Sequence, residues 1–300
     1  MSINKIVTKV DGVENKTIDF NDLKESLSPG VHTITAETWN GAELISTQTK
    51  NITILAAVYD TDYQAVLDAV VAAGDTLPST AQQDIDNQLL VDYKATGAWA
   101  KDDVFLKFSG TGSIGYKLMC WKRLIKAEAF GSLTWSDSGV EGNAANAYIN
   151  TKFNPTLNGI NFLSNDASIN YVGVNAPNTF GVIAGAYDGN NSSFIFWSPF
   201  DSGGKPSYGL NGNAYGVKGA EVLKVGLNGL YRIDDINIKA VGLGEVTVTT
   251  GTAVLNDEEI YILCRSVNGS PAYFWDEDVA LLTMGGNKYN LHAAMASVLE

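Results

Sequence analysis

The sequence contains few of the residues that most catalytic and metal-binding sites require. Its 300 residues include two histidines, His32 and His292, and two cysteines, Cys120 and Cys264. It has no C-x-x-C pair, no G-x-S-x-G motif and no glycine-rich phosphate-binding loop, so the signatures of zinc sites, nucleophile elbows and P-loops are missing. The cysteines could pair only if the fold brought them together, and without a secretory signal we expect two buried thiols.

Long hydrophobic runs and an excess of positive charge are also missing. No apolar run is long enough to span a bilayer, and residues 1–5 are not followed by an apolar segment. We therefore expect neither membrane insertion nor a secretory signal. The net charge of −13, from 20 basic and 33 acidic residues, repels phosphate backbones and argues against nucleic-acid binding. Residues 56–103 carry two lysines and nine aspartates, a net −7, and this change of composition marks a junction.

Residues 1–55 predict a small β-domain. The segment 31–39 alternates apolar and polar residues with a period of two, and Asn40-Gly41 after it suits a type I′ hairpin turn. Return strands are expected at 43–49 and 51–55. Residues 27–35, Leu-Ser-Pro-Gly-Val-His-Thr-Ile-Thr, resemble the end of bacterial and phage immunoglobulin-like repeats, which implies an immunoglobulin-like fold for this domain.

Residues 56–102 change to a helical period and predict a helical connector packed on a sheet. Gly74 and Gly97 end the two predicted helices, and Thr80 with Gln83 forms a capping box at the start of the second. The predicted buried stripes are Tyr63, Val66, Leu67, Val70 and Val71 in the first helix and Ile85, Leu89 and Tyr93 in the second.

Residues 103–300 predict a β-sandwich or jelly roll, because many short apolar strands alternate with turns rich in Gly, Asn, Asp and Ser. A short amphipathic helix from Tyr289 to Ala296 is expected to dock on it. The predicted strands lie at 104–108, 147–151, 171–174, 180–184, 193–197, 229–233, 240–243, 245–248, 260–265 and 279–283.

Several separated blocks resemble uncharacterised tail or structural proteins of phages of Bacteroidetes. The blocks are the helix and Trp-containing opening at 63–106, Cys-Trp-Lys at 120–122, 146–155 and 260–271. This resemblance implies a laminin-G or concanavalin A-like sandwich with a helical preface, on a virion protein. The sequence departs from the family pattern at 285–288, Gly-Gly-Asn-Lys, just before the last helix. That departure puts the packing of the helix in question.

The resemblance implies a phage virion structural or adhesion protein, placed in a tail, a fibre or the capsid decoration and assembled in the host cytoplasm. Its expected partners are other virion proteins and a host surface receptor or glycan. A homo-trimer is one option, although no heptad run requires it. The alternative is a secreted or surface non-catalytic carbohydrate-binding module.

An enzyme is not expected. Glycosidases with a concanavalin-like fold carry paired carboxylates in the pattern E-x-D-x-x-E on one strand face, and no Glu in this chain has an Asp two residues later. His32 and His292 are better explained as surface or packing residues than as catalytic bases.

Two sets of loop residues are candidate sites. Aromatic and amide side chains around 197–215 are suited to glycan or protein recognition, although Trp197 and Phe200 could instead plug the end of the sandwich. No cofactor is required, and calcium is an alternative because hard cations prefer Asp and Asn oxygens in rim loops. The candidate ligand-binding residues are Trp197, Phe200, Asp201, Tyr208, Asn211, Asn213 and Tyr215, and the candidate calcium ligands are Asp188, Asn190, Asp234 and Asp235.

Overall fold

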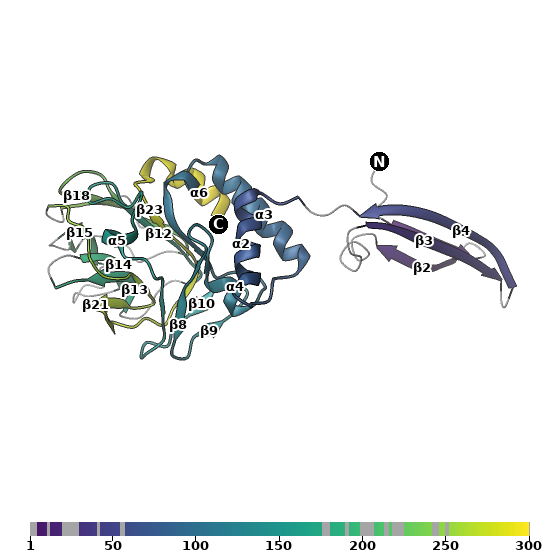
Figure 1. Cartoon of the computed structure of the whole chain (residues 1–300), viewed down its shortest axis with the longest axis horizontal. Coiled ribbons are helices and arrows are strands. Elements are labelled where there is room, and N and C mark those ends of the chain that lie inside the picture. Colours follow the sequence, from purple (N-terminus) through teal and green to yellow (C-terminus); the bar gives the residue numbers. More distant parts are fainter. Residues whose placement is uncertain are drawn as a thin grey trace. The chain divides into compact units, whose positions relative to one another are not determined.

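A computed structural model describes most of the chain. It divides the protein into two compact units, Met1–Tyr59 and Asp60–Glu300, which are drawn in Figure 1. The predicted boundary at residue 55 lies four residues before this division. The described residues are 5–10, 13–19, 30–40, 43–54, 58–175, 181–189, 192–198, 207–212, 216–217, 225–241, 246–249 and 252–299.

The first unit contains two antiparallel hairpins. Strand β1 (Lys5–Val10) pairs with β2 (Val13–Asp19), and β3 (Gly30–Asn40) pairs with β4 (Glu43–Ile54). The two return strands predicted at 43–49 and 51–55 are one strand, because β3 is long enough to pair with the whole of β4.

The second unit has its own core and is expected to fold without the first. Deleting residues 1–59 should leave the free energy of unfolding of the remaining chain unchanged within about 0.5 kcal/mol, as for changes outside a domain core. Urea denaturation followed by circular dichroism measures this value. A fragment that lost its β-signal or its cooperative transition would show that the two units depend on each other.

Two large sheets build the second unit. In the first sheet, β5 (Asp102–Lys107) pairs with β23 (Asp278–Gly285). In the second sheet, β21 (Arg265–Val267) pairs with β13 (Gly181–Tyr187) and with β22 (Ser270–Ala272). Apart from β5, the spatial order of the strands in the first sheet is β19 (Val246–Thr249), β18 (Asn237–Val241), β17 (Gly226–Arg232), β12 (Ser168–Gly173), β23, β10 (Val140–Glu141) and β9 (Thr134–Trp135). The second runs β16 (Gly216–Val217), β15 (Ser207–Gly212), β14 (Ser192–Ser198), β13 (Gly181–Tyr187), β20 (Tyr261–Ile262), β11 (Tyr148–Asn150) and β8 (Glu128–Phe130).

The two sheets pack face to face around a single apolar core. Ile169 and Leu282 of the first sheet and Ile183 and Ile262 of the second are fully buried in the same cluster. Side chains alternate between the two faces of a strand, and β12, β13 and β23 are buried at nearly every position, so both of their faces are covered. The predicted fold class is confirmed: the protein is mainly β, with a two-sheet sandwich and a C-terminal helix (Figure 1).

The strand predicted at 260–265 is interrupted. Leu263 has a φ of 63°, a left-handed backbone conformation, and the chain changes direction there. As a result β20 pairs with β13 antiparallel, whereas β21 pairs with the same strand parallel.

Helices α2 (Thr61–Ala72) and α3 (Thr80–Ala95) form the predicted hairpin. The capping prediction is wrong by one residue, because Ser79 caps α3 and accepts a hydrogen bond from the backbone of Gln82. The predicted buried stripes are also wrong at Val71 of α2, which is 57% exposed, and at Ile85 of α3, which is 61% exposed. The buried face of α3 consists of Gln82, Asp86, Leu90 and Tyr93.

The shorter helices connect strands or end the chain. The last helix, α6 (His292–Leu299), follows a 3-10 turn, η2 (Tyr289–Leu291), and contacts α3 and β17. The others are η1 (Trp99–Lys101), α4 (Ile114–Leu118) and α5 (Pro155–Asn158). A small hairpin of β6 (Met119–Cys120) and β7 (Ile125–Lys126) follows α4. Among the residues described, no helix has the length and apolar character that crossing a membrane takes.

Both cysteines are buried and free, as predicted. Burial raises the pKa of the Cys120 thiol and of the Cys264 thiol. Neither is therefore disposed to act as a nucleophile at neutral pH.

Candidate functional site

The residues predicted to form a recognition loop do not all lie in a loop. Trp197 lies on β14, opposite Val182, and Tyr208 and Asn211 lie on β15. The loop predicted at Tyr208–Tyr215 is thus corrected in its first part, because Leu210 is buried in the core and holds this segment in the sheet. The remaining candidates, Phe200, Asp201, Asn213 and Tyr215, lie outside the described residues.

The Asn211 amide is buried and bonds to the protein backbone. Its side chain is buried and donates hydrogen bonds to the backbone carbonyls of Leu163 (2.9 Å) and Ser164 (3.3 Å). These bonds tie β15 to the loop that follows α5, so this amide is not presented to a ligand.

The candidate calcium ligands Asp234 and Asp188 lie in different parts of the fold and do not form one site. Asp234 accepts hydrogen bonds from the backbone of Ile236 and Asn237 and shapes a turn. These contacts, the bond from the Asn237 side chain first, lower the pKa of its carboxyl. Asp188 contacts the Asp257 backbone at 3.4 Å, in a different part of the fold. Across the described residues no three His, Cys, Asp or Glu side chains gather as a metal site would require, and Asn190 lies outside them.

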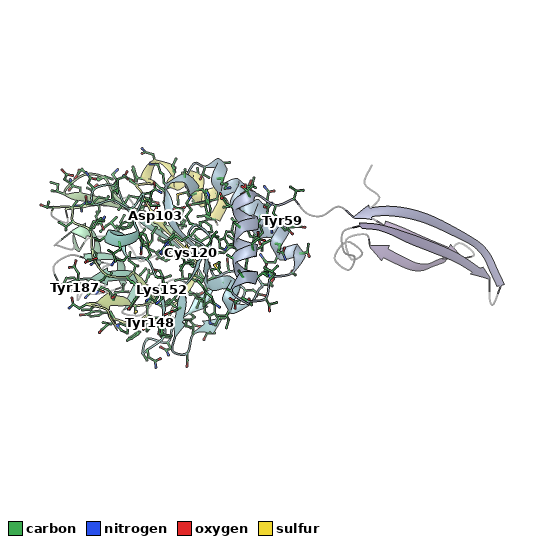
Figure 2. The ribbon with its side chains drawn as sticks, viewed as in Figure 1. Tyr59, Asp103, Cys120, Tyr148, Lys152 and Tyr187 are labelled. Carbon is green, nitrogen blue, oxygen red and sulfur yellow. The ribbon has the colours of Figure 1, made fainter. Side chains whose placement is uncertain are left out.

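The structure instead brings together three aromatic rings from neighbouring strands, which we term the aromatic ladder: Phe130 on β8, Tyr148 on β11 and Tyr261 on β20. The Phe130 and Tyr148 rings are stacked, with centroids 4.7 Å apart and planes 9° apart. The Tyr148 and Tyr261 rings are stacked at 5.1 Å and 28°. Figure 2 labels Tyr148 on the lower part of the sandwich.

Strand pairing explains why these rings meet. Phe130 lies directly opposite Tyr148, and Asn150 lies opposite Tyr261. Ile149, between Tyr148 and Asn150, points into the core. Because side chains alternate along a strand, the rings lie on the outer face of the second sheet.

Polar groups flank the aromatic ladder. Lys152 pairs with Glu128 at 2.7 Å, and this hydrogen bond raises the pKa of the Lys152 ammonium. The Asn150 amide donates to the Glu259 carboxylate at 2.6 Å. The rings are therefore bordered by a cation, two carboxylates and an amide, which together can donate and accept hydrogen bonds.

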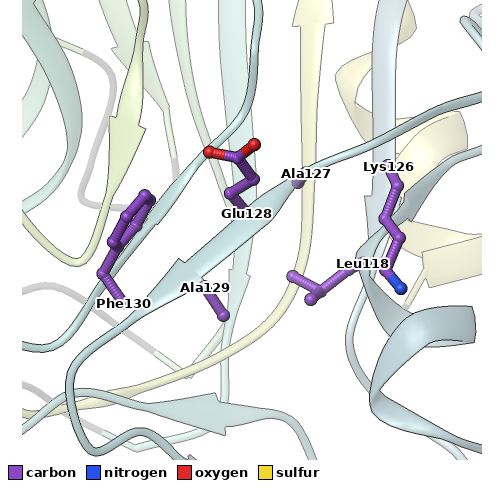
Figure 3. Close-up of a pocket in the computed structure, with 6 residues that line it drawn as sticks. All are labelled: Leu118, Lys126, Ala127, Glu128, Ala129 and Phe130. Carbon is purple, nitrogen blue, oxygen red and sulfur yellow. The ribbon is translucent and has the colours of Figure 1, made fainter.

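The edge of the ladder opens onto a pocket of about 470 Å³. Figure 3 shows Glu128 and Phe130 projecting to one side of β8 and Ala129 to the other. Phe130 is 38% exposed. The pocket is lined by Leu118, Lys126, Ala127, Glu128, Ala129 and Phe130.

One residue beside the ladder, Lys152, and two others of the second unit have a left-handed backbone conformation. Lys152, Leu263 and Tyr273 have φ angles of 56°, 63° and 60°, in the left-handed region that non-glycine residues seldom adopt. Lys152 pairs with Glu128 beside Phe130, and the Tyr273 ring packs on the Arg265 guanidinium at 4.7 Å. The left-handed conformation of Lys152 therefore lies next to the ladder, where it orients the ammonium toward Glu128.

The sequence contained a partial signal for this site. Tyr148 and Asn150 belong to a predicted strand, and Tyr261 belongs to another. The two segments are more than one hundred residues apart, and only the strand order β20-β11-β8 shows that they are neighbours.

Comparisons with known proteins add little to this picture. No family model matches the chain, and no curated protein matches it in sequence. One solved structure with a similar fold is domain 4 of AbnA, an extracellular GH43 arabinanase from Geobacillus stearothermophilus, in complex with arabinotriose. Its TM-score is 0.40 at 12% identity, and the alignment covers 67% of this chain and 98% of that one. This likeness is too distant to transfer a ligand.

Proposed function

We propose that the protein is a non-catalytic adhesion module that binds carbohydrate at the aromatic ladder. The observation that carries the proposal is the exposed ring of Phe130, stacked on Tyr148 at the outer edge of a sheet. Sugar rings present apolar C–H faces that stack on aromatic rings, and hydroxyls that bond to charged and amide groups.

The geometry indicates where a sugar would stack. Tyr148 covers one face of the Phe130 ring. In the described part of the second sheet β8 is the last strand, so no further strand covers the opposite face of that ring. Glu128 and Lys152 lie beside it and supply an acceptor and a donor for sugar hydroxyls.

We further propose a virion as the setting, in a tail, a fibre or the capsid decoration. The support is the sequence resemblance of 63–106, 120–122, 146–155 and 260–271 to phage structural proteins. A glycan-binding surface suits attachment to a host. Mass spectrometry of purified virions should detect the chain in fixed copy number, and its absence from particles would leave a secreted or surface binding module as the setting.

Replacing Phe130 with alanine should weaken glycan binding at least tenfold, equivalent to about 1.4 kcal/mol, because the stacking surface is lost. The wild-type chain is first screened on an array of plant and bacterial surface polysaccharides. Calorimetry with the best binder then compares wild type and variant. The exposed position of Phe130 implies that the melting temperature changes little.

Leu157→Ala provides the matched control, since Leu157 is a 75% exposed apolar residue on α5, outside the ladder. Its glycan affinity should equal that of the wild type. No binding on the array, or equal affinities for the wild type and Phe130→Ala, would refute the proposed site. The proposal that the module is non-catalytic would be refuted if the protein released shortened products from a bound glycan and one carboxylate-to-amide change abolished that release.

A further inference from the structure

A lysine and an aspartate lie in contact in the interior of the second unit, far from the aromatic ladder. Asp102 begins β5, and Lys288 follows the end of β23, the strand that pairs with β5. The Lys288 Nζ atom contacts the Asp102 Oδ1 atom, and both side chains are 0% exposed. The pair joins positions 186 residues apart in the sequence.

One hydroxyl group contacts each member of this pair. The Tyr93 hydroxyl, on α3, donates a hydrogen bond to Asp102 Oδ2 at 2.8 Å. Thr283 Oγ1, on β23, lies 3.1 Å from Lys288 Nζ. The amine is therefore held against one carboxyl oxygen while a donor occupies the other.

We propose that Lys288 and Asp102 condense to form an intramolecular isopeptide bond. In the contact seen, a proton moves from Nζ to Oδ1, which converts the ion pair into a neutral amine and a carboxylic acid. The amine lone pair forms the Nζ–Cγ bond, and the Cγ–Oδ1 bond breaks. Oδ1 leaves as water with its own proton and one from Nζ, so the products are one amide and one water.

The surroundings favour each part of this step. A buried charged pair is costly because both ions lose their hydration. Burial raises the pKa of Asp102 to about 6 and lowers the pKa of Lys288, so the proton transfer that gives the reactive neutral forms costs less than it does in water. The Tyr93 hydroxyl stabilises the negative charge that develops on Oδ2 as the amine adds.

A cavity adjoins the Lys288 side of the pair. A cavity of about 640 Å³ includes Lys288 in its lining, together with Lys101, Asp166 and Asn287. The completed bond would link the start of β5 to the end of β23 and would remove both buried charges. It would close a covalent loop around nearly the whole sandwich.

A second buried pair, Lys107 with Asp86, serves as an internal comparison. Its Nζ–Oδ1 distance is 3.0 Å, and Gln82 and Tyr116 also donate to the Asp86 carboxylate. With three donors this carboxylate is satisfied as an anion, so we expect no condensation there.

Trypsin digestion of the denatured wild-type chain, followed by tandem mass spectrometry, tests the proposal. The linked protein gives a branched peptide in which 102–107 is joined to 266–300, with about 18 Da missing for the lost water. Cleavage after Lys107 in the same peptide shows that this second buried lysine keeps its free amine.

The unlinked alternative gives a different set of fragments. Recovery of 102–107, 266–288 and 289–300 as separate peptides, with no mass loss, would overturn the proposal. Lys288→Arg, whose guanidinium does not condense with a carboxylate, is the control and should give peptide 102–107 in free form. The wild-type result does not depend on whether this variant folds.

Discussion

Replacing Asp86 with leucine is expected to lower the free energy of unfolding of the second unit by about 3–5 kcal/mol. Asp86 lies on α3 and is fully buried. Its carboxylate accepts hydrogen bonds from Gln82 (2.9 Å) and Tyr116 (2.6 Å) and pairs with Lys107. The leucine would leave a buried ammonium, an amide and a hydroxyl without this acceptor, and each loses hydration without compensation.

Urea denaturation of wild type and variant measures the loss. Asp92→Leu is the matched control, because Asp92 is exposed on the same helix and bonds only Gln88 among the contacts described. Its expected change is below about 0.5 kcal/mol. Adding Lys107→Met to Asp86→Leu should restore part of the stability, since the unpaired ammonium is then absent. Equal small losses for Asp86→Leu and Asp92→Leu would contradict the role of the buried carboxylate.

Several strands could be predicted from the sequence because each is a short segment with apolar residues between turn residues. Predicted segments at 171–174, 229–233 and 279–283 correspond to β12, β17 and β23. All three strands are buried at nearly every position, so their local composition indicated them without knowledge of their pairing partners.

The helix α3 shows why the rest could not be predicted. Its buried face includes Gln82 and Asp86, whereas Ile85 is exposed. A hydrophobic stripe predicts packing on an apolar surface, but α3 packs where Lys107 and Tyr116 provide polar partners. Only the tertiary structure brings these partners to the helix.

The aromatic ladder was missed for a related reason. The sequence predicts recognition near 197–215, where aromatic and amide residues are close in sequence. Phe130, Tyr148 and Tyr261 are distant in sequence and meet only through the strand order of the second sheet. Local composition carries no information on that order.

Replacing Lys288 with methionine is expected to make stability fall steeply as the pH rises. The pKa of Asp102 is about 6 in the folded chain, against an ordinary 3.8, because of its burial, and the charge of Lys288 lowers it. Without that charge the folded pKa lies above 6. The folded state then binds the proton more tightly than the unfolded state, so stability is fully present below about pH 4 and is lost as the pH rises toward the folded pKa.

The loss between pH 4 and pH 8 should reach at least about 3 kcal/mol, since each pKa unit corresponds to about 1.4 kcal/mol. Urea midpoints measured across this range give the slope. Other charged or polar groups also lie near the pair, namely Lys101, Lys122, Asp103, Tyr93 and Tyr231. The double variant Asp102→Asn with Lys288→Met retains all of them and lacks only the carboxyl, so the difference between the two variants isolates Asp102. If the stability of the Lys288→Met variant followed that of the double variant at every pH, Asp102 would not have a raised pKa in the folded chain. Because the single variant has no amine at position 288, this outcome is independent of whether the wild-type pair is covalently linked.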